Sequence, residues 1–120
     1  MLIEILEPNF KNESDKGTLL QLVREGWKQV NVVKYHKGVV SGGHYHKYNL
    51  ECFYMVSGEI ELTVWNAEGE TEKYVFKTGD MFQINKFVFH TLTYKENSIL
   101  VALYDRGVEM DDGTKDIWSE

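Results

Sequence analysis

The chain has 120 residues, of which 42% are hydrophobic and 13% aromatic, so its size and apolar content suit one domain with one core. Its formal net charge of −6 and its two arginines, Arg24 and Arg106, argue against a broad nucleic-acid-binding surface. No apolar run approaches the ~20 residues that cross a bilayer. The first residues carry neither the basic leader nor the small-residue cleavage site of a signal peptide.

The cysteine content points to a reducing compartment. Cys52 is the only cysteine, which excludes a disulfide within the chain. We therefore expect a cytoplasmic protein in which Cys52 is a small hydrophobic residue of a sheet.

The N-terminal segment, residues 1–29, is expected to lead into the main fold as a strand segment. Within it, residues 7–17 hold the only proline and several polar turn formers, which predicts a loop.

Alternation of apolar and polar residues with period two dominates residues 30–104. In residues 59–65, for example, Ile60, Leu62 and Val64 would share one face of a half-buried strand. Six further runs rich in β-branched and aromatic residues predict strands at 30–35, 52–56, 72–76, 82–84, 89–94 and 99–104. Turn residues separate these runs, and no helical stripe stands out. The pattern predicts an all-β sandwich or small barrel with its core at about 30–104.

The C-terminal segment, residues 105–120, is acidic. We interpret Asp111, Asp112 and Asp116 as a solvated charge run. Ile117 and Trp118 could dock this tail on the barrel or on a second subunit, and a homodimer is possible.

A candidate metal site begins at "GGHYHKYNLE", residues 42–51. Residues i and i+2 of a strand point to one face, so His44 and His46 would project together. Glu51 could supply an oxygen, and His90 a third imidazole from another strand. Imidazole suits Zn, Fe, Mn, Ni or Cu, and four protein ligands leave one or two positions open for water or substrate.

The spacing of these residues resembles a known family. The first motif of the cupin superfamily has two glycines at its ends, and here these are Gly38 and Gly58. Between them the motif spacing is five residues, His44, one residue, His46, four residues, Glu51 and six residues.

The second cupin motif is matched only in part. Gly79 and His90 fit it, whereas Asn85, Phe87 and Tyr94 stand where it has proline, glycine and asparagine. The resemblance implies a cupin jelly-roll barrel of two antiparallel sheets. It also implies one divalent metal (Zn, or Mn, Fe or Ni) held by the three histidines and Glu51.

Finer resemblances point to sugar chemistry. "DKGTLLQLV" (15–23), "KQVNVV" (28–33) and "SGGHYHK" (41–47) resemble the corresponding parts of nucleotide-sugar 3,4-ketoisomerases and 3,5-epimerase-like cupins. The pattern "GGHYH…E…GE" is similar to the C-terminal, zinc-bearing cupin of a capsular polysaccharide epimerase/reductase. The ketoisomerases carry arginine in place of Ser41 and glutamine in place of Glu51.

The leading functional hypothesis is a sugar or nucleotide-sugar isomerase or epimerase of polysaccharide biosynthesis. Such a reaction needs a cation to stabilise an enolate and a base within ~3 Å to move the proton. The candidate bases are Tyr54, His36, Lys47 and Tyr94.

Two other hypotheses remain open from the sequence. An Fe- or Ni-dependent cupin dioxygenase would need an apolar pocket, to which the phenylalanines at 53, 82, 87 and 89 could contribute, although they also suit a barrel core. The second hypothesis is a metal-stabilised module that binds a small molecule without catalysis.

Overall fold

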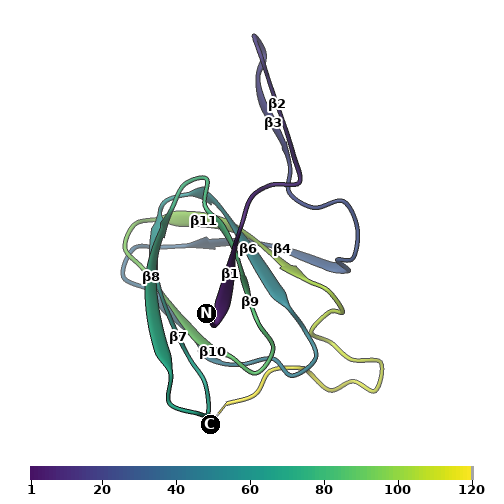
Figure 1. The fold of residues 1–120 in the computed structure, drawn as a ribbon, viewed down its shortest axis with the longest axis vertical. Helices are drawn as coiled ribbons and strands as arrows, with labels where there is room; N and C mark the ends of the chain where they lie inside the picture. The colour runs from purple at the N-terminus through teal and green to yellow at the C-terminus, as the bar shows by residue number, and fades with distance from the viewer. Residues whose placement is uncertain (120) are drawn as a thin grey trace.

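The computed structural model describes residues 1–119 and consists of strands, turns and loops, without a helix in that range (Figure 1). Accordingly, no helix among these residues could span a membrane. The all-β jelly-roll prediction is confirmed.

Two antiparallel sheets form the barrel. The five-stranded sheet has the order β1 (Ile3–Leu6), β9 (Met81–Ile84), β6 (Glu51–Ser57), β11 (Ser98–Tyr104) and β4 (Gln29–Tyr35). The four-stranded sheet has the order β5 (Val40–His44), β10 (Phe89–Tyr94), β7 (Glu59–Trp65) and β8 (Thr71–Lys77). The predicted strands between residues 30 and 104 are all present, and β5 is an additional strand in this range. Strand β1 lies in the N-terminal segment that was predicted as a strand segment.

The core lies between the two sheets, and period-two patterning explains why. Ile60, Leu62 and Val64 of β7 are fully buried, while the alternate residues of this strand are only partly buried. Stacked aromatic rings of Phe53, Phe76 and Phe82 fill the middle of the core.

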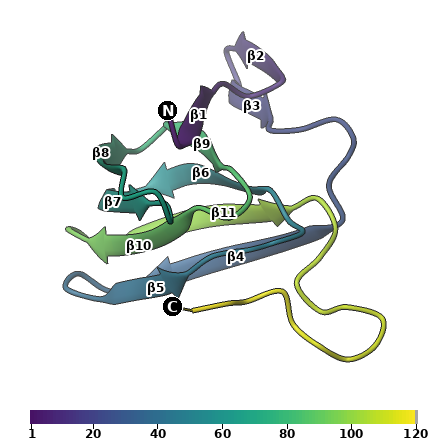
Figure 2. The same cartoon turned by 60° about the horizontal axis from the view of Figure 1, so that its bottom comes forward.

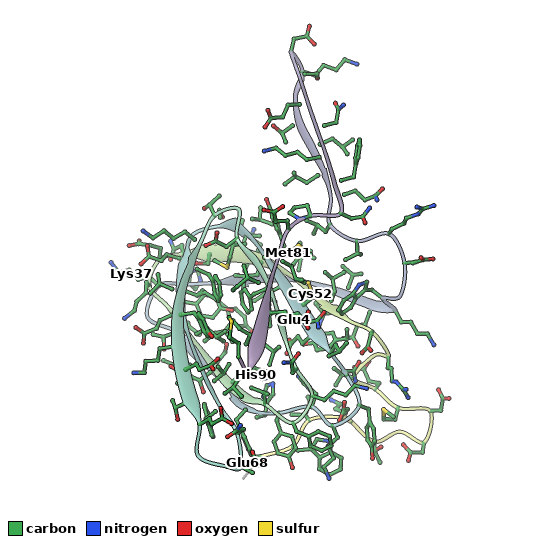
Figure 3. All side chains as sticks on the ribbon, in the orientation of Figure 1. Glu4, Lys37, Cys52, Glu68, Met81 and His90 are labelled. Carbon is green, nitrogen blue, oxygen red and sulfur yellow. The ribbon has the colours of Figure 1, made fainter. Side chains whose placement is uncertain are left out.

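A second, smaller cluster covers the outer face of the five-stranded sheet. Cys52, Met81 and Leu103 are buried there beneath Trp27 and Leu22 of the N-terminal segment. Figure 3 places the labelled Cys52 and Met81 close together. The expectation that Cys52 is a small hydrophobic residue of the sheet is confirmed.

The loop predicted at residues 7–17 is wrong, because most of it belongs to a hairpin. Strands β2 (Phe10–Ser14) and β3 (Gly17–Gln21) pair through a two-residue turn and project away from the barrel (Figure 1). Every residue of β2 is exposed, so backbone pairing rather than an apolar face defines this strand. That is why hydrophobic patterning missed it.

The prediction of a solvated tail is wrong for Asp116, which is buried, and holds for the exposed Asp111 and Asp112. After β11 the chain loops outward and returns beside β5 (Figure 2). There Trp118 forms an isolated bridge with Tyr45, so this part of the tail docks on its own barrel.

Candidate metal centre

The candidate ligands lie at or next to the ends of three strands, two from the four-stranded sheet and one from the five-stranded sheet. His44 is the last residue of β5 and pairs directly with His90, near the start of β10. Glu51 is the first residue of β6, and His46 lies in the short connection between β5 and β6. Figure 3 shows the labelled His90 within the ring of strands. Strand pairing therefore brings together residues that are 46 positions apart.

A glycine and a bulge allow β5 and β10 to approach at this point. The pairing of the two strands shifts between His90 and Thr91. Gly42 has a φ of 102°, and a Cβ atom there would lie 2.5 Å from the His90 carbonyl oxygen. Only glycine fits such a close approach without movement of the backbone.

The three imidazoles converge on one point. One ring nitrogen from each of His44, His46 and His90 lies within 4.8 Å of the other two. The Glu51 Oε1 atom lies 3.0 Å from His46 Nε2 and 3.2 Å from His90 Nε2. On the other side of the carboxylate, the Tyr104 hydroxyl donates a 2.6 Å hydrogen bond to Oε2.

Hydrogen bonds on the far side of two rings orient them. The Nδ1 atom of His46 faces the Asp116 carbonyl oxygen, and that of His90 faces the Val88 carbonyl oxygen. A carbonyl only accepts, so each Nδ1 carries the proton. In the neutral rings both Nε2 lone pairs then point toward the Glu51 carboxylate. Acceptors that face one another in a buried site fit a shared cation, and carbonyl-bound Nδ1–H groups are the usual support of histidine metal ligands.

The protonation equilibria agree with this arrangement. Burial, together with the neighbouring His90 and His46, lowers the pKa of His44 to about 4, so this ring is neutral at pH 7 and keeps a free lone pair. Burial alone would raise the pKa of Glu51, but the adjacent His46 and His90 rings, which donate to the carboxylate through Nε2 when they are protonated, lower it overall. Burial also opposes protonation of His46, whereas Glu51 and the Asp116 carbonyl raise its pKa. The buried carboxylate thus attracts positive charge to this position.

A cavity of about 240 Å³ opens beside these groups inside the barrel. His44, Glu51 and His90 form one part of its wall. The rest consists of aliphatic and aromatic side chains with three tyrosines, namely Val33, Tyr35, Phe53, Leu92, Tyr94, Ala102 and Tyr104, together with Ser41 and Gly42.

Comparison with known proteins identifies the family. A family model described as a cupin domain matches residues 31–104. The chain belongs to the cupin family. No curated protein matches the sequence.

Solved structures share the whole cupin barrel at low sequence identity. QdtA, a sugar 3,4-ketoisomerase from Thermoanaerobacterium thermosaccharolyticum in complex with TDP, is 16% identical with a TM-score of 0.79, over 99% of this chain and 88% of that one. WlaRB, a TDP-quinovose 3,4-ketoisomerase from Campylobacter jejuni, is 16% identical with a TM-score of 0.82, over 98% and 92% of the chains. The dTDP-4-dehydrorhamnose 3,5-epimerase from Sulfolobus tokodaii is 18% identical with a TM-score of 0.70, over 87% and 75%.

One departure from the second cupin motif has a backbone conformation that favours glycine. Phe87 occupies the glycine position of that motif and has a φ of 66°, in the left-handed region where glycine is favoured. Its backbone N–H donates a 2.8 Å hydrogen bond to the His46 carbonyl oxygen. The turn before β10 therefore contacts the histidine loop even without the motif glycine.

Of the four candidate bases, the structure brings only Tyr94 to the cavity. Tyr54 lies on the opposite face of β6 from Glu51 and packs in the outer cluster with Cys52. His36 is exposed in the connection between β4 and β5. The Lys47 ammonium lies 3.7 Å from the centroid of the Trp118 ring, outside the cavity wall. For Tyr54 and Tyr94, the face of the strand on which the side chain lies decides the placement, and this depends on register. His36 and Lys47 lie in connections between strands.

Sequence reasoning did not single out Tyr35, Tyr104 or the buried Asp116. The two tyrosines belong to predicted strands. Residues i and i+2 of a strand share a face, so their spacing from inward-facing residues of the same strands could have predicted that they point into the barrel. Asp116 has no local signal, because its partners in the histidine loop are 67 to 70 positions away.

The phenylalanines considered for an aromatic-substrate pocket are dispersed. Phe53 lines the cavity, and Phe82 is buried in the core against Phe76. Phe89 stacks on Trp65, and Phe87 is exposed. The phenylalanines thus build the barrel and its rim rather than one apolar chamber.

Proposed function

We propose that this cupin is a metal-dependent isomerase or epimerase that acts on a nucleotide-linked ketosugar. The observation that carries the proposal is the convergence of three histidine nitrogens and a buried carboxylate beside one cavity, with two of the rings oriented by carbonyl-bound Nδ1–H groups. The fold shared with TDP-sugar ketoisomerases and a dTDP-sugar 3,5-epimerase supports the substrate class.

The metal ligands would be His44, His46, His90 and Glu51, with zinc, manganese, iron or nickel as the ion. A bound divalent ion supplies a Lewis acid that stabilises negative charge on the oxygen of an enolised ketone. Tyr104 would hold the Glu51 carboxylate in place through its 2.6 Å hydrogen bond.

The cavity fits the sugar part of such a substrate. Its volume of about 240 Å³ is below the roughly 300 Å³ at which pockets for drug-sized ligands begin, so it suits one ring, with the nucleotide outside. Hydroxyls of Tyr35, Tyr94 and Tyr104 offer hydrogen bonds that an aromatic substrate would not use. This lining supports a carbohydrate over the dioxygenase alternative.

Tyr94 is our candidate for the proton-transfer group. It is buried in the cavity wall, and desolvation raises its pKa to about 12, which keeps the phenol protonated at neutral pH. A protonated phenol can return a proton to a defined face of an enolate.

Metal content tests the centre. Purified wild-type protein is expected to hold about one divalent ion per chain by elemental analysis, and His46→Ala to lose most of it. His36→Ala is the matched control, because His36 is an exposed histidine outside the cavity. Equal metal in all three proteins would show adventitious binding and contradict the proposal.

Proton exchange tests the chemistry. The substrate to try is TDP-4-keto-6-deoxyglucose, the ligand of one QdtA structure. In deuterated water the wild-type protein should introduce deuterium next to the keto group, as followed by NMR, and Tyr94→Phe should slow this by about 10²–10⁴-fold. Binding of the sugar without exchange would favour the non-catalytic binding module instead.

We also propose that two copies of the chain pair. The hairpin carries exposed Phe10 and Leu19, at 50% and 59% of their full accessible area, away from the barrel. Strand β4, at an edge of its sheet, exposes Val30 and Val32 at 61% and 67%. Edge strands with apolar faces are usually covered in the native assembly, and the hairpin of a second copy is suited to cover this one.

The cytoplasmic location also stays a prediction.

A further inference from the structure

The C-terminal strap, residues 105–118, lies along the loop that carries His46. After β11 it swings away from the barrel and comes back beside β5 (Figure 2). Each of the six residues from Tyr45 to Leu50 has a hydrogen bond to this strap. The loop has almost no regular secondary structure of its own, so the strap supplies much of the hydrogen bonding that defines its path.

One strap residue, Asp116, makes most of these bonds. Its carboxylate accepts hydrogen bonds of 2.9–3.0 Å from the backbone N–H groups of three successive residues, Lys47, Tyr48 and Asn49. The Asn49 amide and the Trp118 indole N–H add two more, each at 2.8 Å. Asp116 is only 1% exposed, so these five donors compensate for burial of its charge.

The same residue also orients the ring of His46. The His46 Nδ1–H donates to the Asp116 carbonyl oxygen, which directs Nε2 toward Glu51 and the other histidines. His90 differs, because its Nδ1 faces a carbonyl oxygen only two residues away. The orientation of His46 therefore depends on a segment 70 positions distant in the sequence, whereas that of His90 is local.

We propose that Asp116 is a positioning residue for the metal ligand His46. It acts from outside the cavity, since it does not belong to the cavity wall. Its carboxylate holds the backbone of residues 47–49, and its carbonyl holds the His46 ring in the Nδ1–H form. The inference rests on the metal centre proposed above and adds a residue that the cupin motifs do not contain.

The first experiment compares two substitutions in the strap. Asp116→Asn replaces one acceptor oxygen by an N–H donor that would face backbone N–H groups, so the loop should shift. The control is Asp112→Asn, because Asp112 is exposed and bonds only to Thr114 within the strap. Zinc affinity, measured by competition with a chromophoric chelator, should fall about 10–100-fold for Asp116→Asn and stay at the wild-type value for Asp112→Asn. Unchanged affinity of Asp116→Asn, or an equal loss in both variants, would overturn the inference.

The second experiment needs no substitution. The ¹⁵N shifts and couplings of the His46 ring in metal-free wild-type protein at alkaline pH should show the proton on Nδ1, and zinc should then bind at Nε2. A proton on Nε2 would overturn the inference even if Asp116→Asn fails to fold. Absence of zinc binding by the wild type would contradict the proposed metal centre instead, while an Nδ1–H signal would still support the role of Asp116 toward His46.

Discussion

Gly42 and Gly43 both adopt left-handed backbone conformations, with φ of 102° and 78°, but their surroundings differ. A Cβ atom on Gly42 would collide with the His90 backbone, whereas one on Gly43 would have no atom within 4 Å. The pair therefore separates the cost of the backbone conformation from that of the close contact between β5 and β10.

Gly42→Ala is expected to destabilise the protein by more than Gly43→Ala. Both substitutions carry the roughly 1–3 kcal/mol of a left-handed alanine, and only the first also forces β5 away from the bulge at His90. Urea unfolding should show the difference in stability, and zinc competition a weaker affinity for Gly42→Ala alone. Equal effects of the two substitutions on both measurements would contradict the role of this contact in placing His44 beside His90.

Phe87 allows a test of backbone strain at a single position. Its φ of 66° disfavours any side chain, and its ring is largely exposed. Phe87→Gly should be more stable than Phe87→Ala by about 1 kcal/mol, because both lose the ring and only glycine relieves the strain. Greater flexibility of glycine in the unfolded chain reduces this gap. Thermal or urea unfolding measures it, and a less stable glycine variant would show that the backbone here is not strained.

At the scale of elements, the histidine loop and the C-terminal strap form one unit held by buried polar groups. Asn49 is 1% exposed and joins the two segments. Its amide oxygen accepts hydrogen bonds from the backbone N–H groups of Arg106 and Gly107, and its amide nitrogen donates to the Gly107 carbonyl and to Asp116. The strap thus depends on this side chain for its path away from β11.

Asn49→Ala is expected to destabilise the protein by about 1–3 kcal/mol or more, since it leaves several buried groups without a partner. Its matched control is Asn66→Ala, which removes bonds to Glu70 in an exposed turn. Urea unfolding gives the stabilities, and limited proteolysis should cut the strap faster in Asn49→Ala only. An intact strap and wild-type stability in that variant would contradict the unit described here.

For the whole molecule, the feature that calls for an explanation is the hairpin, which extends the longest dimension to 49 Å beyond a compact barrel (Figure 1). An isolated two-stranded ribbon is at best marginally stable in water, so it needs a further surface to pack against. In the pairing proposed above, the apolar edge at β4 of the second copy would provide one.

Light scattering after size-exclusion chromatography should therefore give twice the chain mass of 14.0 kDa for the wild type. The double substitution Phe10→Ser and Leu19→Ser should shift the protein toward the monomer, because it removes the apolar face of the hairpin. Val75→Ser is the control, as it alters an exposed apolar residue of β8, in the other sheet. A monomeric wild type, or a double variant that stays dimeric, would contradict pairing through the hairpin.

Sequence patterning by itself determined the fold class, most strand positions and the spacing of His44, His46, Glu51 and His90. These features are local or motif-based, because a strand that buries one face must alternate along its length. Patterning failed for β2, which buries nothing against its own barrel.

Only the tertiary structure decided which other side chains surround the site. The face on which Tyr54 or Tyr94 lies follows from strand register, and a displacement of one residue reverses it. From the sequence alone, Asp116 is predicted to be a solvated acid. In the folded chain it is buried, because the backbone N–H groups of residues 47–49 point toward its carboxylate. Burial of a charge depends on donors brought from elsewhere by the fold, and no local pattern encodes them.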